Sequence, residues 1–334
     1  MTSKLNFGII GCSSVANNSF IPALLKTKSA ELESVGSRSK SKAKDFAKKF
    51  HSKNFGIYDD ILENEKIDAV YISLPIALQE KWILKAAKAG KHVLCEKSST
   101  TSFSSAQKIV TECKKNGTRI MENFPFVFHP QQTKIQQLIN SKKLGKTFSF
   151  SGKFGFNLNF SSNDFRFKKE LGGGILNDVG CYMISASKFI FQSVPLRIFC
   201  NLEYNKKYKI DTKGTIHMTF PNGNSAIGQF GYSNKFQSNY NIWSEKSIIT
   251  ADKAFNIKPN QSTKISIISE KNSKIIQVKK YDQFKLLLDY FCKKIQNNSS
   301  DNSLFEDSLL KQALIMQYAR KSAKSKSSLE IKYS

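Results

Sequence analysis

The chain has 334 residues, of which 40% are hydrophobic and 26 are Phe, so it is long enough to bury the cores of two domains. No apolar run reaches the roughly 18 residues that a membrane span needs, which excludes a membrane-spanning protein. The net charge of +26 comes from 52 basic residues, but only five are Arg and the lysines are spread over every segment. Because nucleic-acid readers use Arg for base edges, we expect no nucleic-acid partner and interpret the charge as a solvated surface that steers anionic ligands.

Cysteine and histidine usage points to a reducing compartment without a metal centre. Six cysteines are scattered without a Cys-x-x-Cys pair, and the four histidines are isolated. We therefore expect no metal and no disulfide framework. The N-terminus runs directly into a predicted strand and lacks the layout of a signal peptide, so we expect a cytoplasmic protein.

A strand, a tight turn and a helix are predicted at the start of the chain. Residues 5–10 form an apolar run, and an amphipathic helix begins after Ala16. The turn matches the dinucleotide-binding pattern Gly-x-Gly-x-x-Gly/Ala except that Ser13 replaces the middle glycine; its hydroxyl could itself bond a phosphate oxygen. An ordinary tight turn is the alternative. The candidate cofactor-binding residues of this turn are Gly11, Cys12, Ser13, Ser14, Val15 and Ala16.

The second predicted strand, residues 31–36, ends in Ser37 and Arg38. An NAD enzyme usually has an acid near this position to hold the ribose hydroxyls, and none is present. Arg38 can pair with the 2′-phosphate of NADP, and Ser37 can donate to it. The sequence therefore favours NADP(H) over NAD, although a serine-capped helix start with chance basic residues would look the same.

Strands and helices continue to alternate up to about residue 124. Strands are predicted at 68–73, 91–95 and 119–122, with helices at 76–89 and up to about 115. This alternation predicts a doubly wound parallel sheet, so we expect an N-terminal Rossmann domain over residues 1–124.

The strand at 91–95 ends on Glu96 and Lys97. In open α/β sheets, ligands lie outside the carboxyl ends of the strands. A lysine there can reach a substrate oxygen and donate a proton or a charged hydrogen bond. The competing interpretation is a surface lysine beside a glutamate, which is common in so lysine-rich a chain.

The pattern changes after residue 125 to alternating strands. They are predicted at 148–156, 196–204, 216–220, 225–232, 246–251, 263–269 and 274–280, followed by helices from about 281. The fold class is thus α/β in the first half, with a C-terminal α+β domain over 125–334 built on an open, mostly antiparallel sheet. An exposed sheet face with aromatic residues is either a ligand wall or an oligomer surface.

Between these strands lies Gly172-Gly173-Gly174, followed by a predicted helix with Asp178 and Tyr182 spaced to share one face. A Tyr hydroxyl can donate a proton, and a nearby Asp or Lys can tune it. Taken singly, these features also fit a flexible loop, a helix-start charge and a core aromatic. Their occurrence together with Glu96 and Lys97 favours an active site.

The whole chain resembles the family of glucose–fructose oxidoreductase, inositol dehydrogenase and MocA-type NAD(P)-dependent enzymes. The motifs that carry the resemblance are the Gly11–Ala16 turn, Leu74-Pro75, Glu96-Lys97, Met121-Glu122-Asn123-Phe124 and Gly172-Gly173-Gly174 with Asp178 and Tyr182. The resemblance implies hydride transfer at a sugar-like carbon. It implies a catalytic set of Lys97, Asp178 and Tyr182, and further cofactor-binding residues Leu74, Gln79, Glu96, Lys97, Asn123 and Arg166.

Within this family the chain is similar to the nucleotide-sugar 3-ketoreductases of deoxysugar pathways. The shared runs are residues 74–78, residues 121–126, His129-Pro130-Gln131 and Asp164-Phe165-Arg166. We therefore expect an NADPH-dependent reductase of a nucleotide-linked 3-keto-deoxyhexose that assembles as a homodimer or homotetramer.

The chain departs from the family pattern at two positions. Ser98 replaces the Pro of Glu-Lys-Pro, and Gln79 replaces the usual His after Leu-Pro. Two alternatives follow from the resemblance and these departures. One is a free-aldose or trans-dihydrodiol dehydrogenase of the same family, and the other is a non-catalytic NADP-binding scaffold.

Overall fold

The computed structural model describes residues 4–141, 143–158, 164–297 and 304–333. The chain folds into two compact units. The first unit comprises Met1–Asn123 and Phe284–Ala313, and the second comprises Phe124–Gln283 and Leu314–Ser334. Residues 284–313 belong to the first unit, whereas the division expected from the sequence placed them in the second range.

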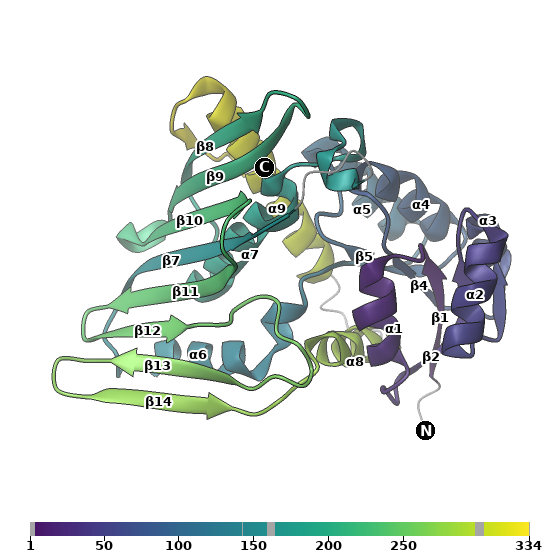
Figure 1. Cartoon of the computed structure of the whole chain (residues 1–334), viewed down its shortest axis with the longest axis horizontal. Coiled ribbons are helices and arrows are strands. Elements are labelled where there is room, and N and C mark those ends of the chain that lie inside the picture. The colour runs from purple at the N-terminus through teal and green to yellow at the C-terminus, as the bar shows by residue number, and fades with distance from the viewer. Residues whose placement is uncertain (1–3, 142, 159–163, 298–303, 334) are drawn as a thin grey trace. The chain divides into compact units, whose positions relative to one another are not determined.

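A six-stranded parallel sheet forms the centre of the first unit (Figure 1). Its strands are β1 (Leu5–Ile10), β2 (Ala30–Gly36), β3 (Asn54–Gly56), β4 (Ala69–Ile72), β5 (His92–Glu96) and β6 (Ile120–Asn123). Their spatial order, β3-β2-β1-β4-β5-β6, is that of the doubly wound dinucleotide-binding fold. The predicted Rossmann sheet is confirmed. The short edge strand β3 was not predicted, because its three residues are too few to carry a periodic signal.

Helices cover the strands of this sheet. They are α1 (Ile21–Leu24), α2 (Lys40–Phe50), α3 (Tyr58–Glu63), α4 (Ile76–Lys88), α5 (Phe103–Lys115), α8 (Gln283–Gln296) and the first part of α9 (Leu304–Ser325). Strand residues such as Val70 and Val93 pack with Ile83 of α4 and Ile109 of α5 in one buried core. Burial on both faces explains why these strands are continuous apolar runs.

The first turn of α9 is tied to the sheet of the first unit by Glu306. Its carboxylate accepts hydrogen bonds from Nε and Nη2 of Arg119, both at 3.0 Å, and from the Ile120 N–H at 3.0 Å. Glu306 is 2% exposed, so this bidentate pair lies inside the unit. This contact explains why the residues at the start of α9 belong with β6. The sequence carries no signal for that pairing.

The second unit is built on a nine-stranded sheet (Figure 1). Its strands are β7 (Thr147–Phe156), β8 (Arg197–Asn205), β9 (Ile210–Thr219), β10 (Ser225–Tyr232), β11 (Gln237–Ser244), β12 (Ser247–Ala251), β13 (Thr263–Ile268), β14 (Ser273–Val278) and β15 (Leu329–Glu330). The order is β14-β13-β12-β11-β7-β10-β9-β8-β15. The described pairs are antiparallel except β7 with β10, which confirms the predicted mostly antiparallel sheet. β11 was not predicted, because two of its four buried positions, Ser238 and Ser244, are polar.

One face of this sheet is covered by helices, among them α6 (Pro130–Asn140) and α7 (Cys181–Phe191). The side chains on that face alternate along the strands and are buried, for example Phe150 and Phe154 on β7 and Tyr240 and Ile242 on β11. The opposite face carries exposed side chains from the same strands. The period-two pattern in the sequence therefore reports burial on a single face.

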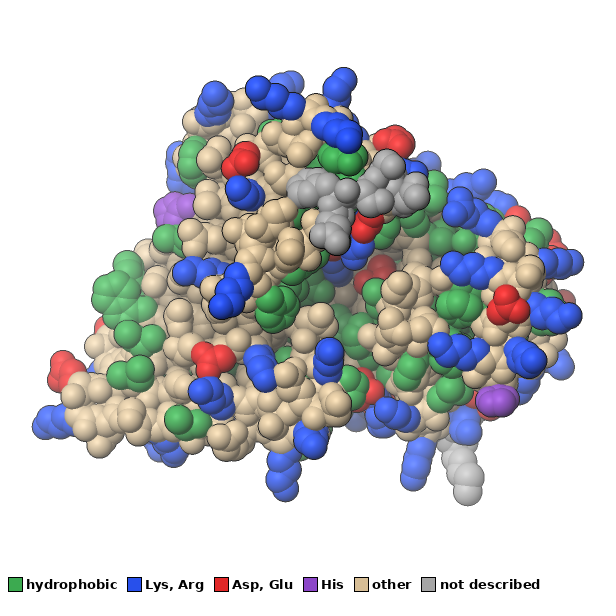
Figure 2. All heavy atoms as spheres, in the orientation of Figure 1, with side chains coloured by type: hydrophobic (Ala, Val, Ile, Leu, Met, Phe, Trp, Pro, Cys, Tyr) green, Lys and Arg blue, Asp and Glu red, His purple; other side chains and the backbone are tan. Residues whose placement is uncertain are grey.

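The described residues bear on the expectations for charge distribution, membrane helices, metal ligands and disulfides. Figure 2 shows Lys and Arg side chains spread over the visible face rather than gathered in one patch. Within the described ranges, no helix combines the length and apolarity that crossing a membrane would require. Among the same residues, no three His, Cys, Asp or Glu side chains form a group that could hold a metal ion. All six cysteines are buried and form no disulfide.

Candidate active site

The turn after β1 has the geometry of a dinucleotide-binding turn. Gly11 has φ +109°, and a Cβ there would lie 2.7 Å from the Ser73 carbonyl oxygen, so only glycine fits. The Ser13 hydroxyl donates to Ser73 Oγ at 2.9 Å and accepts from the Ala16 N–H at 3.0 Å. It thereby holds the turn to the end of β4. Ser14 and Val15 are exposed at its tip, and a π-helical turn, Ala16–Phe20, leads into α1.

The end of β2 brings together hydroxyl and cationic groups. Ser37 is buried, and Arg38 is exposed and hydrogen-bonded to Tyr58 at the start of α3. The Cys12 thiol donates to the Gly36 carbonyl at 3.8 Å. Burial raises the pKa of Cys12 to about 11, although Lys42 and Ser37 oppose this, so the thiol is neutral. Tyr58 was missed by sequence reasoning because it lies on a different element, with no motif to link it to Arg38.

Leu74 and Gln79 follow β4. Leu74 is partly buried and packs against the core of the first unit beside Gly11. Gln79 is fully buried, and its Nε2 donates to the Ser98 carbonyl at 3.2 Å. Its Oε1 has no hydrogen-bond partner among the described residues. Gln79, at the position where the family pattern has His, therefore holds the loop after β5 through this hydrogen bond.

The carboxyl end of β5 holds Glu96 in a partly buried hydrogen-bond network. Its Oε1 accepts from the Tyr71 hydroxyl and from Asn123 Nδ2, both at 2.5 Å. Burial raises the pKa of Glu96, while Tyr71, Lys97 and Asn123 oppose that rise. Tyr71, which stacks on Phe20 with ring centroids 3.6 Å apart, was not predicted because it reads as an ordinary core residue of β4.

Lys97 follows this network directly and is partly buried. The Lys97–Ser98 peptide bond is cis, at the position where the family pattern has a proline. The next loop residue, Ser99, donates its N–H to Glu122 Oε1 at 2.7 Å. Because carboxyl ends of parallel strands share one edge, Lys97 and the predicted cofactor residues that follow β1, β2 and β4 lie along one edge of the sheet.

In the second unit, Asp178 is the centre of a charged cluster. Its Oδ2 accepts from Arg166 Nε at 2.9 Å and from the Tyr232 hydroxyl at 3.2 Å. Arg166 also contacts Asp164 at 3.3 Å. Burial alone would lower the pKa of Arg166, but the two carboxylates outweigh it and raise the pKa, so the guanidinium stays charged. Arg166, assigned to the cofactor by resemblance, thus binds two acids of its own unit.

Tyr232 is fully buried, and burial together with Asp178 raises its pKa. Its hydroxyl is therefore a permanent hydrogen-bond donor to Asp178. Sequence reasoning missed Tyr232, since it lies far from Asp178 in the chain and reads as a core residue of β10. The burial that fixes the Tyr232 hydroxyl as a donor also gives Tyr232 the sequence pattern of a core residue.

Tyr182 lies in the first turn of α7 among aromatic rings. Its ring centroid is 5.2–5.7 Å from those of Phe124, Phe126, Phe154 and Phe255. Asp178 lies one element earlier, in the π-helical turn Leu176–Gly180. The predicted helix is therefore present, but it begins with a π turn that apolar spacing does not reveal. The wide turn joins the glycine run to α7.

The His129-Pro130-Gln131 run anchors the second unit. His129 caps α6, with Nδ1 accepting the Gln131 N–H at 3.2 Å. Gln131 and Gln132 donate to the carbonyls of residues 253 and 254 at 2.8 and 3.2 Å. These bonds hold the segment that ends in Phe255, which packs on Tyr182. The motif thus supports the aromatic surroundings of Tyr182.

Acid should loosen this anchor. Burial lowers the pKa of His129 from 6.5 to about 4, so the unfolded chain binds the proton at a higher pH than the folded chain. Stability is therefore lost as pH falls from about 6.5 toward 4. Between pH 7 and pH 5 we expect His129 to cost about 1–2 kcal/mol, allowing for solvent screening. Urea unfolding of wild type and His129→Gln at both pH values measures this; an identical pH dependence would refute it.

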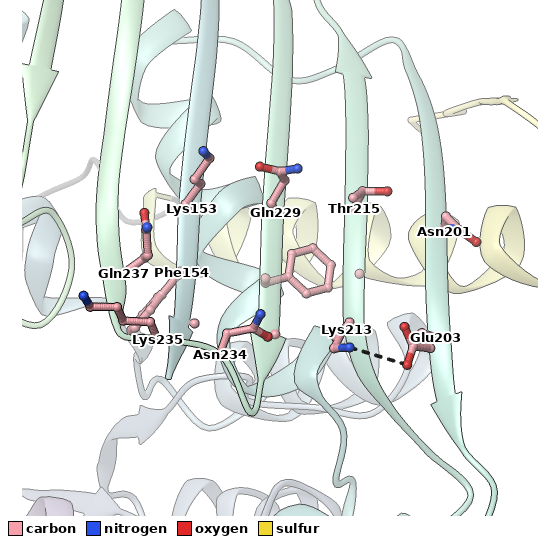
Figure 3. Close-up of a pocket in the computed structure, with 14 residues that line it drawn as sticks. Lys153, Phe154, Asn201, Glu203, Lys213, Thr215, Gln229, Asn234, Lys235 and Gln237 are labelled. Atoms are coloured by element: carbon pink, nitrogen blue, oxygen red, sulfur yellow. Dashed lines mark ion pairs between the residues drawn. The ribbon is translucent and has the colours of Figure 1, made fainter. Parts of the chain in front are cut away.

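A cavity of about 500 Å³ lies on the exposed face of the second unit's sheet (Figure 3). Figure 3 shows Lys153, Gln229, Thr215 and Asn201 on neighbouring strands, and Lys213 paired with Glu203 at 3.7 Å. None of the predicted site residues lines this cavity. The polar side chains of this cavity are exposed.

Known proteins with the same arrangement define the family. The model of the oxidoreductase family with an NAD-binding Rossmann fold matches residues 5–124, and that of the GFO/IDH/MocA C-terminal domain matches residues 133–250. The dTDP-3,4-didehydro-2,6-dideoxy-alpha-D-glucose 3-reductase of Saccharopolyspora spinosa is 31% identical over 256 residues, 76% of each protein. The D-xylose 1-dehydrogenase (NADP(+)) 2 of Haloferax volcanii is 29% identical over 265 residues, 79% of this chain and 81% of that one.

Among solved structures, a 3-ketoreductase from Actinomadura kijaniata in complex with NADP and TDP-benzene superposes with a TM-score of 0.90. The two are 25% identical, and the match covers 96% of this chain and 98% of the other. The predicted family resemblance is therefore confirmed: the chain belongs to the GFO/IDH/MocA family of oxidoreductases.

Proposed function

We propose that this chain is an NADPH-dependent reductase of a ketosugar linked to a nucleotide. The observation that carries the proposal is the 31% identity to a nucleotide-sugar 3-reductase over three quarters of both proteins. The placement of Lys97 at the carboxyl end of β5 supports it independently. In this proposal the first unit binds the cofactor, and the second binds the sugar.

The first unit fits NADPH in two places. At Gly11 the backbone packs so closely on Ser73 that a Cβ would collide, which matches the tight turn that the first glycine of a dinucleotide fingerprint provides. At the end of β2, Ser37 and the exposed Arg38 supply a hydroxyl and a guanidinium, the groups suited to the 2′-phosphate. When bound, NADPH supplies a hydride from carbon 4 of its nicotinamide.

The protein's own groups complete the reduction. Lys97 donates a charged hydrogen bond to the ketone oxygen, and Lys97 or Tyr182 delivers the proton that turns the ketone into an alcohol. Asp178 orients Tyr182 and accepts a hydrogen bond from a sugar hydroxyl. Because Arg166 and Tyr232 both donate to Asp178, its carboxylate is held before substrate arrives. Such preorganised groups favour the developing alkoxide over the ketone.

An absorbance assay of NADPH oxidation tests the proposal. A dTDP-linked 3-keto-deoxyhexose should be reduced with one NADPH consumed per alcohol formed, and the same sugar without the nucleotide should react far more slowly. If all ketosugars leave NADPH untouched although NADPH binds, the reductase proposal fails and the non-catalytic scaffold takes its place.

A free-aldose dehydrogenase is the second candidate, favoured by the 29% identity to a D-xylose dehydrogenase. It would oxidise an unlinked aldose with NADP and would gain nothing from a nucleotide on the substrate. Initial rates with D-xylose and NADP, set beside the ketosugar assay, separate the two candidates.

We further propose a homodimer or homotetramer that uses the exposed face of the second unit's sheet. Trp243, Ile248 and Ile268 are direct cross-strand neighbours and are 57%, 42% and 53% exposed. Such a row of apolar side chains favours cover by another surface. Sedimentation velocity should show a dimer or larger that Trp243→Lys weakens; a wild-type monomer would contradict this.

The six reduced, buried cysteines suit a cytoplasmic enzyme.

A further inference from the structure

We propose that Asp211 is a positioning residue that, with Arg320, fixes the glycine run and the π turn carrying Asp178. Asp211 lies on β9 and Arg320 on α9, both in the second unit. The inference rests on the proposed function, because Asp178 and Tyr182 are assigned their catalytic roles there. The bonds that follow explain how a residue outside the motif would set the geometry of the motif.

The carboxylate of Asp211 binds the start of the π turn through the main chain. Its Oδ2 accepts the Leu176 N–H at 2.6 Å, and Ile175 also donates its N–H to this carboxylate. N–H groups in a first helical turn lack partners within the helix, and a carboxylate both satisfies them and complements the helix dipole. Asp211 thus caps the helical segment that continues through Asp178 to Tyr182.

The third glycine of the run is explained by the same carboxylate. Gly174 has φ +119°, and a Cβ there would collide with Oδ1 of Asp211. The Gly174 carbonyl in turn accepts the Asp178 N–H at 3.1 Å, and its N–H donates to the Arg166 carbonyl at 3.0 Å. The Gly174 backbone is therefore held between Asp211 on one side and the backbones of Asp178 and Arg166 on the other.

Arg320 completes the support from α9. It donates to Asn177 Oδ1, and Asn177 Nδ2 donates to the Gly172 carbonyl at 2.9 Å. Burial raises the pKa of Asp211, while the Leu176 N–H and Arg320 oppose the rise. Burial lowers the pKa of Arg320, and Asp211 opposes it. Each partner therefore favours the charged form of the other, and losing one leaves a poorly solvated charge beside the loop.

The test compares Asp211→Asn with a matched control, Glu203→Gln. Glu203 is an exposed carboxylate on neighbouring β8, paired only loosely with Lys213. In Asp211→Asn we expect kcat for the ketosugar to fall by about 10- to 100-fold, because small misplacements of reacting groups carry such costs. In the same variant, the KM for the ketosugar and the Kd for NADPH should stay within about twofold of the wild-type values. Glu203→Gln should match wild type in all three quantities.

A second readout does not depend on activity. Hydrogen exchange followed by mass spectrometry should show faster exchange in peptides covering residues 174–180 of Asp211→Asn, with the α6 peptides unchanged. In Gly174→Ala, the added Cβ would displace the Asp211 carboxylate. This variant should give the same exchange pattern and the same loss in kcat. It also serves if Asp211→Asn does not fold.

The two readouts separate the two proposals. Suppose that the wild type reduces no ketosugar, while hydrogen exchange in the two variants rises only around residues 174–180. The proposed function then fails and the anchoring role of Asp211 stands. Unchanged exchange at residues 174–180 in both variants, or a kcat within twofold of wild type while the enzyme is active, would overturn the positioning role. A loss of NADPH affinity as large as the loss of kcat would overturn it too.

Discussion

Replacing Lys97 by alanine is expected to lower kcat by about 10²- to 10⁴-fold, the range of general acid catalysis. The ammonium group would polarise the ketone oxygen and supply or relay the proton, and alanine can do neither. NADPH binding should change little, because the groups proposed to hold the phosphates lie on the Gly11 turn and at the end of β2. Single-turnover NADPH oxidation measures the chemical step, and fluorescence titration measures the cofactor Kd.

Lys88→Ala is the matched control for this variant. Lys88 is an exposed lysine at the end of α4, so its loss changes net charge equally without touching the carboxyl edge of the sheet. The control should keep wild-type kcat. Near wild-type turnover in Lys97→Ala would remove Lys97 from the chemistry and leave Tyr182 as the proposed proton donor.

Replacing Arg38 by alanine is expected to weaken NADPH binding by about 10- to 100-fold, the equivalent of one charged hydrogen bond to phosphate. The binding of NADH, which has no 2′-phosphate, should change less than about threefold by the same reasoning. Isothermal titration with both cofactors measures the ratio directly. Arg38 is exposed, so the substitution removes a surface group together with its hydrogen bond to Tyr58.

Lys40→Ala controls for the loss of one positive charge nearby, since Lys40 is an exposed residue that begins α2. It should weaken both cofactors slightly and equally. Equal losses of NADPH and NADH affinity in Arg38→Ala would contradict the assignment of Arg38 to the 2′-phosphate, and the preference for NADP would then need another source.

The sequence was most informative where structure is local. The apolar runs at residues 5–10 and 91–95 predict buried strands because both faces of a parallel sheet are covered, and the turn at Gly11 is set by a few adjacent residues. The glycine run identified the segment that carries Asp178, although it did not reveal that this segment is a π turn.

Residues that support the site from a distance could not be found in this way. Tyr232 donates to Asp178 from another strand, and Tyr71 donates to Glu96 from the strand beside it. Both are buried tyrosines on apolar strands, so their periodicity is that of ordinary core residues. Asp211 likewise gives no signal until its carboxylate is seen against Gly174.

Segments joined by long-range pairs were also beyond sequence patterns. The start of α9 belongs with β6 because Glu306 binds Arg119 and the Ile120 N–H inside the first unit. The sequence predicts helices in this region, but only the buried ion pair decides which sheet the start of α9 joins. Domain ranges drawn from the change in periodicity near residue 125 therefore placed residues 284–313 in the second range.

The most direct test of the proposed function follows the hydride itself. NADPH carrying deuterium at carbon 4 would be incubated with a dTDP-linked 3-keto-deoxyhexose, and the sugar product examined by mass spectrometry and NMR. The proposal predicts one deuterium at carbon 3 of the new alcohol, in proportion to the NADPH consumed, and almost none with Lys97→Ala. Binding of NADPH without transfer of label to any ketosugar would contradict it.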